Sequence, residues 1–360
     1  MVKRAVLILA GGKARRFQNQ RGMWQDKALA ELFGKPLLVH ALENVRDVAE
    51  EIVICVDNEA RKAQYAEVLA FYCIENIRLV VDEKIDHVKG PNVGILTGLK
   101  SVKADYCLTL PCDMPLMQPK VADYLLNLAE GSRVVVPMWP TGRLETLITA
   151  VERNSVLEVT DTLCQLRRPR SDDIMRGALN VLLVSPYREI KKLDPELKSF
   201  VNINSQEDLT RLQTRQAHGS SAENMQLNLG ALPLSQLQRL RDAAALYREG
   251  NFMEAAKTFS SCSTQLEKEK SFFWASLSRE NEGASFLQLS KRQSEPTLAA
   301  ENNSKGKTAL LTAVNDYGLE AGEFEANHCA FLAERANADK AWCEAWAQGK
   351  LGEGERFPPR

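Results

Sequence analysis

The order of apolar and polar positions divides the first 210 residues into short β-type runs and amphipathic stretches. Residues 5–10 (AVLILA) are continuously apolar, which is typical of a strand buried on both faces of a sheet. Between such runs, apolar positions recur every three or four residues, as in an amphipathic helix. This alternation predicts an α/β fold with a mostly parallel sheet covered on both faces. We expect strands at 5–10, 52–57, 77–82, 106–110, 133–138, 179–184 and 201–203, and helices at 37–48, 60–71, 94–100 and 120–128.

The pattern changes after Leu212. Residues 213–229 contain few apolar side chains and a Gly-Ser-Ser turn, which is typical of a linker. The rest of the chain is rich in Ala, Leu, Glu, Lys and Arg, with helical spacing and hardly any strand pattern. We therefore predict a first domain over residues 1–212, a linker over 213–232 and an all-helical domain over 233–360.

A glycine followed two residues later by an aromatic residue occurs at Gly250 and again at Gly322 in the predicted helical domain. The segment around Gly250 resembles the turn of a tetratricopeptide-type helical hairpin, and a generic helical bundle is the alternative. Stacked helical hairpins commonly bind peptides or subunits, so we expect this domain to bind a protein partner or mediate self-association. Its aromatic residues, such as Trp342 and Trp346, would line that surface or form the core.

Charge and cysteine content narrow the function classes. The chain has 46 Lys and Arg against 47 Asp and Glu, and a net charge of −1 offers no large basic field for nucleic acid or an anionic membrane. The first apolar run is too short for a signal peptide or a membrane span, so we expect a cytoplasmic protein. The eight cysteines form no C-x-x-C pair, which favours reduced, mostly buried thiols.

Two glycines, Gly11 and Gly12, follow the first predicted strand, where the missing Cβ lets backbone N–H groups approach a phosphate or a base. The segment matches neither the Walker A loop nor the G-x-G-x-x-G of dinucleotide folds. A cationic loop follows, and fixed cations beside a glycine turn suit a triphosphate, although a solvated surface loop is the alternative. The cations of this loop are Lys13, Arg15, Arg16 and Arg21.

An acidic residue, Asp113, stands at the carboxyl end of the apolar strand expected at 106–110. Open α/β sheets bind ligands beyond the carboxyl ends of their strands, so this carboxylate would face the same crevice as Gly11 and Gly12. There it can hold Mg²⁺, which would bridge phosphate oxygens during displacement at phosphorus. The alternative is an aspartate that caps the turn before Met114 and Pro115.

Six motifs in a fixed order resemble the molybdenum cofactor guanylyltransferases of the nucleotidyltransferase superfamily. The resemblance covers residues 4–212, and its last motif, the Asn-Ile-Asn phrase ahead of Glu-Asp-Leu, separates this family from sugar-phosphate and isoprenoid-pathway relatives. The motifs are LAGG with Arg15 and Arg16, DKA at 26–28, GKPLL at 34–38, GPNVGI at 90–95, PCDMPL at 111–116 and FVNINSQEDL at 200–209.

The resemblance implies a Rossmann-like, three-layer nucleotidyltransferase domain that binds GTP. It further implies Mg²⁺-dependent transfer of GMP to the terminal phosphate of molybdopterin, with release of pyrophosphate. A carboxylate such as Asp82 suits guanine because it can accept from both N1–H and the exocyclic amine. The residues that the resemblance assigns are Leu9, Ala10, Gly11 and Gly12 for nucleotide contact, Lys27 and Arg16 for the phosphates, Asn58 and Asp82 for the base and ribose, Asp113 for Mg²⁺, and Asn202 and Asn204 for the catalytic end.

Three departures from the family pattern affect the expected site. The segment 17–25 is longer than usual and implies a longer lid, Asn92-Val93 would alter the pocket beside the base, and residues 145–147 (Glu-Thr-Leu) replace the usual Pro-Leu on the pterin side. CTP as the donor, or another acceptor such as cobinamide phosphate, is an alternative function. A non-catalytic nucleotide-binding scaffold is another, although the presence of both Lys27 and Asp113 argues against it.

Overall fold

The computed structural model of the chain describes residues 3–12, 26–85, 88–211 and 223–351. The chain divides into two compact units, an α/β unit over Met1–Leu227 and a helical unit over Asn228–Arg360. The division falls later in the chain than the boundary expected at residue 212, because a further strand of the sheet lies close to residue 227.

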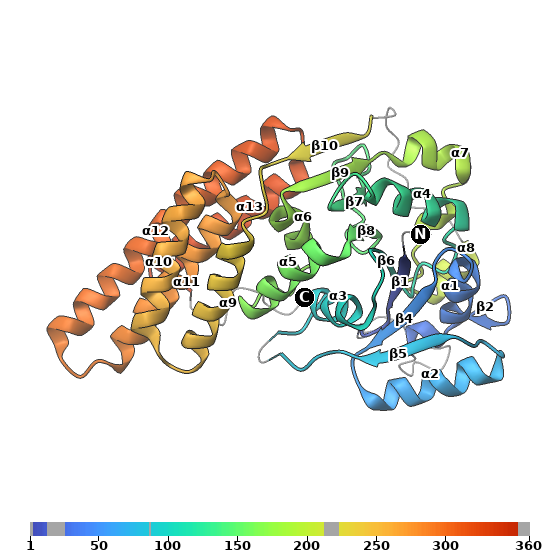
Figure 1. Ribbon diagram of the computed structural model, residues 1–360, viewed down its shortest axis with the longest axis horizontal. Coiled ribbons are helices and arrows are strands. Elements are labelled where there is room, and N and C mark those ends of the chain that lie inside the picture. Colours follow the sequence, from blue (N-terminus) through green and yellow to red (C-terminus); the bar gives the residue numbers. More distant parts are fainter. Residues whose placement is uncertain (1–2, 13–25, 86–87, 212–222, 352–360) are drawn as a thin grey trace. The chain divides into compact units, whose positions relative to one another are not determined.

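In the described part of the α/β unit, eight strands form one sheet in the order β10-β9-β7-β8-β6-β1-β4-β5 (Figure 1). Strand β1 pairs in parallel with β4 and β6, and β5 pairs in parallel with β4. Strand β7 is parallel to β9, whereas β8 is antiparallel to both β6 and β7. The predicted mostly parallel sheet is therefore confirmed. The strands are β1 Arg4–Leu9, β4 Glu51–Val56, β5 Ile77–Val81, β6 Tyr106–Pro111, β7 Val134–Pro137, β8 Thr149–Glu152, β9 Asn180–Val184 and β10 Met225–Asn228, with a separate hairpin of β2 Glu31–Leu32 and β3 Lys35–Pro36.

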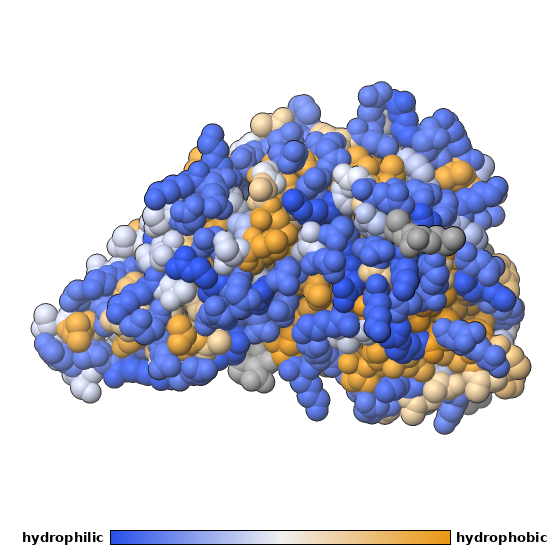
Figure 2. Space-filling view, viewed as in Figure 1, coloured by the Kyte–Doolittle hydropathy of each residue, from blue (hydrophilic) through white to orange (hydrophobic). Residues whose placement is uncertain are grey.

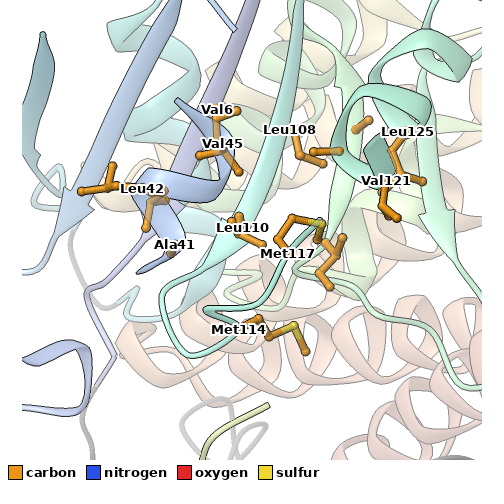
Figure 3. Packing of buried hydrophobic residues seen from close by; sticks show 14 of the residues in the cluster. Val6, Ala41, Leu42, Val45, Leu108, Leu110, Met114, Met117, Val121 and Leu125 are labelled. Carbon is orange, nitrogen blue, oxygen red and sulfur yellow. The ribbon is translucent and has the colours of Figure 1, made fainter. Parts of the chain in front are cut away.

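Helices cover both faces of this sheet, because its inner strands are apolar on both sides. On one face, Val6 of β1, Val45 of α1, Leu108 of β6 and Val121 of α4 belong to one apolar cluster, in which Val6 lies beside Val45 (Figure 3). On the other face, Leu7 packs against α3, where Gly98 leaves so little room that a Cβ would lie 2.9 Å from the leucine side chain. The helices are α1 Leu37–Val45, α2 Glu59–Phe71, α3 Pro91–Ser101, α4 Pro119–Ala129, α5 Arg153–Gln165, α6 Asp172–Ala178, α7 Lys191–Leu193 and α8 Gln206–Arg211, with short turns Lys27–Leu29, Pro186–Ile190 and Lys198–Phe200.

The sheet is only partly covered at its β5 edge. Strand β5 ends the strand order, and its apolar side chains are only partly buried. Figure 2 shows the corresponding orange side chains gathered over β5 and α2, among hydrophilic ones.

Three segments differ from the expected strands. Residues 201–203 are a loop rather than a strand, and the N–H of Ile203 donates to the Asp113 carbonyl at 2.9 Å. Strand β8 was missed because polar residues stand at both of its ends. Residues 225–228, expected in the linker, form β10, since Leu227 is buried while Gln226 and Asn228 on either side of it are exposed.

The described part of the helical unit contains five helices. Gly250 ends the turn between the first two with a φ of +84°, a conformation that favours glycine. The same glycine-x-aromatic pattern at Gly322 does not mark a second turn, because this glycine lies inside the unbroken helix α12. A helix of 31 residues does not fit a tetratricopeptide hairpin, in which two helices share about 34 residues, so the generic helical bundle is the better description. The helices are α9 Leu234–Arg248, α10 Phe252–Lys268, α11 Phe272–Arg292, α12 Pro296–Ala326 and α13 Ala330–Ala347.

The aromatic residues of this unit form its core. Trp274 is fully buried, and Trp342 and Trp346 are 8% exposed, with ring centroids 4.6 Å apart. The two tryptophans pack with Leu310 and Tyr317 of α12. Their main role is therefore to join α12 and α13, which is the core role rather than the surface role considered from the sequence.

Candidate active site

One edge of the sheet gathers the glycine turn and three acidic residues. Gly11 and Gly12 follow β1, Asp57 follows β4, Asp82 follows β5, and Asp113 lies just beyond β6 (Figure 1). The registers of these parallel strands align their carboxyl ends. This is the edge at which open α/β sheets bind ligands.

Lys27 reaches this edge from a single turn of 3₁₀ helix. Its Nζ donates to Asp113 Oδ2 at 2.5 Å and to Asn204 Oδ1 at 2.7 Å. The Lys27 and Asp113 side chains are only 15% and 21% exposed, so solvent screens their attraction less than it would at the surface. The turn therefore holds a cation beside the strand-end carboxylate.

The loop that carries Asn202 and Asn204 is attached to the same place. Besides the Ile203–Asp113 backbone bond, Asn204 Nδ2 donates to Asn202 Oδ1 at 2.9 Å. The Asn204 N–H donates to Asp208 Oδ2 at 2.8 Å, in the first turn of α8. The structure thus brings Lys27, Asp113 and both asparagines together.

Asp113 retains acceptor capacity beyond this ion pair. Its Oδ1 is buried and takes no hydrogen bond from the described residues. A buried carboxylate oxygen without a donor is costly unless a ligand or cation satisfies it. The described residues contain no group of three His, Cys, Asp or Glu side chains that could hold a metal by themselves. A divalent cation here would therefore need oxygen ligands from a substrate or from water.

Asp82 lies in a narrow space between two glycines. A Cβ on Gly11 would lie 3.0 Å from Asp82 Oδ2, and one on Gly94 would lie 3.5 Å from Oδ1. Asp82 Oδ1 is buried and accepts no hydrogen bond within the described part of the chain. Burial, and then the negative charge of Asp57, raises the pKa of Asp82 to about 6. Asp82 is therefore a buried acceptor whose Oδ1 still needs a donor.

The residues before the glycines are held by the sheet. The N–H of Ala10 donates to Cys55 O at 2.9 Å, and the Leu9 carbonyl accepts from the N–H of Cys112 at 3.2 Å. Gly12, in contrast, has no described atom within 4 Å of the place where a Cβ would lie. Residues 9–12 therefore pass from fixed strand to a backbone that a ligand can approach closely.

Asn58 has a structural role in this chain. It is the N-cap of α2, and its Oδ1 accepts from the N–H of Arg61 at 2.9 Å. Its Nδ2 donates to Asp57 Oδ1 at 2.8 Å. Both ends of the amide are engaged within the protein, so capping accounts for this residue without the nucleotide contact that the resemblance implied.

Arg61 also belongs to this site, although no motif of the sequence marks it. Its Nε donates to Asp26 Oδ2 at 2.8 Å and its Nη1 to Asp57 Oδ1 at 2.7 Å. Burial by itself would lower the pKa of Arg61, but the neighbouring carboxylates raise it overall. One feature of the sequence could have pointed to Arg61. It stands in the first turn of a helix, where the helix dipole disfavours a cation unless that cation has acidic partners.

The predicted phosphate cation Arg16 lies outside the described residues, as do Lys13, Arg15, Arg21 and the expected lid over 17–25. Their contribution to the site is still a prediction.

Among the helices that the structure describes, none is long and apolar enough to cross a membrane.

Asn92 has a structural role at the start of α3. It is fully buried, and its Nδ2 donates to the carbonyls of Arg168 and Arg170, each at 2.8 Å. Val93 packs with Leu96 and Cys164 in a small apolar cluster. These two residues hold the start of α3 against the segment 168–170, so their packing explains them without the base pocket.

The Glu145 carboxylate lies in an aromatic environment before β8. It is 8% exposed and accepts from Trp139 Nε1 at 2.6 Å, and the Trp139 ring packs edge to face on Tyr187 and Phe200. Burial raises the pKa of Glu145, whereas the Trp139 hydrogen bond and the charge of Arg143, whose Nη2 lies 3.4 Å from Oε1, oppose this rise. Glu145 is therefore a buried carboxylate that Trp139 and Arg143 hold in place.

Comparisons with known proteins found similar sequences and structures. The family described as "MobA-like NTP transferase domain" matches residues 6–179. A "Probable molybdenum cofactor guanylyltransferase" of Methanosarcina acetivorans is 32% identical over 207 residues, which cover 57% of this chain and 88% of the relative. A protein of the same name from Pyrococcus horikoshii is 30% identical over 58% of this chain and 98% of its own length.

A solved structure titled "Molybdopterin-guanine dinucleotide biosynthesis protein A" from Archaeoglobus fulgidus is 24% identical, with a TM-score of 0.47, and covers 58% of this chain and 96% of that one. The family assignment depends on the sequence matches, which include a relative covered over most of its length. From the strand-end site and these matches together, we conclude that the chain belongs to the MobA-like NTP transferase family and is a nucleotidyltransferase.

Proposed function

We propose that this protein transfers GMP from GTP to the terminal phosphate of molybdopterin and releases pyrophosphate. The observation that carries the proposal is the meeting of Lys27, Asp113 and Asn204 at the sheet edge that also holds the glycine turn. A phosphate cation and a carboxylate with an oxygen left for a metal ion are the two side chains that phosphoryl displacement needs most. The names of the relatives support the choice of donor and acceptor.

The donor base is assigned from Asp82. Guanine presents N1–H and its exocyclic amine side by side, and a carboxylate accepts from both. Asp82 offers such a carboxylate in a space bounded by Gly11 and Gly94, with Oδ1 lacking a donor among the described residues. Cytosine presents one donor beside an acceptor on the same edge, so an ionised Asp82 favours GTP over CTP.

The donor phosphates are assigned to the other end of this edge. Lys27 would neutralise the phosphate charge, and the open backbone at Gly12 would lie against it. Asp113 Oδ1 fits Mg²⁺, because this ion prefers carboxylate, water and phosphate oxygens and needs few protein ligands. When bound, Mg²⁺ supplies charge compensation at the phosphate oxygens. Asn204 would keep Lys27 in place beside it.

The acceptor needs no side-chain base. The terminal phosphate of molybdopterin is already ionised at pH 7, so in-line placement and cationic compensation are what the protein must provide. Residues 145–147, where this chain departs from the family pattern, lead into β8, which pairs with β6, the strand that Asp113 follows. We assign this segment to the acceptor side.

A nucleotide and acceptor panel tests the proposal. The purified protein with MgCl₂ is given GTP, CTP or ATP, each with molybdopterin, with cobinamide phosphate or without an acceptor, and pyrophosphate release is measured. We expect release only with GTP and molybdopterin together. Preference for CTP contradicts the assignment of Asp82, and release that requires cobinamide phosphate contradicts the acceptor. Tight GTP binding without turnover under either acceptor points to a nucleotide-binding scaffold instead.

A further inference from the structure

The Arg61 guanidinium joins three segments that the sequence keeps apart. It contacts Asp26, 35 residues earlier in the chain, and Asp57 at the end of β4. Its Nη1 also lies 3.4 Å from the Ala10 carbonyl, directly before the glycine turn. Arg61 is 17% exposed, and its planar fork allows donation in these separate directions, which a lysine ammonium on a flexible stem does not reproduce.

The carboxylate of Asp26 is committed to this contact. Its Oδ2 accepts from Arg61, whereas its Oδ1 accepts from the Tyr65 hydroxyl and from the Ala28 N–H, each at 3.0 Å. Arg61 and Tyr65 are four residues apart in α2, so they present both donors from one face of the helix. The Ala28 bond makes Asp26 the N-cap of the turn that begins at Lys27.

The backbone at Lys27 is therefore held in place by the residue before it. Asp26 is the residue immediately before Lys27, and its side chain is anchored to α2 by an ion pair and a hydroxyl. The other end of the residue is held as well, because Lys27 Nζ donates to Asp113 and to Asn204. A cation whose backbone and side chain are both held is preorganised for a developing phosphate charge.

We propose that Arg61 is a positioning residue that acts through Asp26 to hold Lys27 where the phosphates of the nucleotide bind. Asp57 and the Ala10 carbonyl anchor the guanidinium on the sheet, and Asp26 transmits that position to the lysine. This role rests on the proposed function in one respect, namely that the ligand is a guanine nucleotide.

Three variants and a phosphate series test the role. Arg61→Met removes the guanidinium, whereas Arg61→Lys keeps the positive charge. Lys62→Met is the matched control, because Lys62 is the next residue of α2 and its Nζ lies 3.7 Å from Glu59 Oε2, a loose ion pair. Affinities for GMP, GDP and GTP are measured by calorimetry without acceptor, alongside melting temperatures. We expect Arg61→Met to weaken GTP binding about tenfold and GMP binding less than about threefold. Arg61→Lys should recover part of the loss, and Lys62→Met should match the wild type.

A double variant separates positioning from general support. If Arg61 acts through Lys27, then Lys27→Met with Arg61→Met should bind GTP within about twofold of Lys27→Met alone. Equal losses for GMP and GTP, or additive losses in the double variant, overturn the positioning role while GTP binding by the wild type stands. Absence of GTP binding by the wild type overturns the proposed function itself, and the role of Arg61 with it.

Discussion

Lys27 and Asp113 form an ion pair of 2.5 Å in which the lysine occupies only one carboxylate oxygen. The other oxygen, Oδ1, is buried and accepts nothing from the described residues. The two side chains therefore have complementary roles, since the lysine supplies a fixed positive charge and the aspartate keeps an oxygen available for a second cation.

We expect Asp113→Asn to leave the fold intact and to reduce transfer by at least about a hundredfold, because the amide neither pairs with Lys27 nor holds Mg²⁺ as a carboxylate does. The measurement is kcat/KM for pyrophosphate release at saturating Mg²⁺, with circular dichroism as the check on folding. Asp123→Asn, an exposed aspartate paired with Arg4, is the control. Activity of Asp113→Asn within about threefold of the wild type would contradict the assignment.

GTP affinity should fall as the pH drops through about 6, because the pKa of Asp82 is raised to about 6 and only the ionised form accepts from both guanine donors. Binding measured from pH 5 to pH 8 checks this. Asp82→Asn should weaken GTP binding about tenfold at pH 8 and flatten the pH dependence. A variant that keeps the wild-type pH profile would assign the titration to another group.

The same aspartate should reduce stability above pH 6. A folded-state pKa above the unfolded value means that the native state binds the proton more tightly, so the stabilisation is complete below pH 4 and is lost as the pH rises through about 6. Asp82→Asn should therefore raise the melting temperature at pH 8 while it weakens GTP binding. A lower melting temperature at pH 8 would show that the carboxylate supports the fold.

In the helical unit, Asp316 predicts a second pH effect. Burial, and then the charge of Glu267, raises the pKa of Asp316 to about 7, against the opposing charge of Arg279. Because this pKa is higher in the folded than in the unfolded state, as for Asp82, the contribution of Asp316 to stability is complete below pH 4 and is lost as the pH rises through about 7. Asp316→Asn should raise the denaturant midpoint more at pH 8 than at pH 5, since part of the contribution is still present at pH 5. Asp242→Asn, on the exposed side of α9, is the control, and equal effects at both pH values would contradict the prediction.

We expect a fragment of residues 1–230 to fold cooperatively and bind GTP like the full chain, because the compact α/β unit ends at Leu227. A fragment of residues 1–212 should be less stable, since it lacks β10 and the buried Leu227 at that edge of the sheet. Urea unfolding of the two fragments measures the difference. Aggregation of the longer fragment would mean that the boundary is misplaced.

The sequence by itself determined the layered α/β fold, the strand-end site and the presence of a separate helical unit. Apolar periodicity reports which face of a segment is buried, so β1, β4 and β6 could be predicted together with the residues that follow them. Because parallel strands end at one edge, Gly11, Asp82 and Asp113 could be placed near one another without coordinates.

Only the tertiary structure decided which side chains pair across that edge and which glycines make turns. The Arg61–Asp26 contact joins residues 35 positions apart, and no local pattern encodes the direction of a side chain over that distance. The same holds for Gly322: its local sequence resembles that around Gly250, yet it stays helical because α12 continues between packed neighbours. Local propensity sets which conformations are available, and burial against distant segments selects among them.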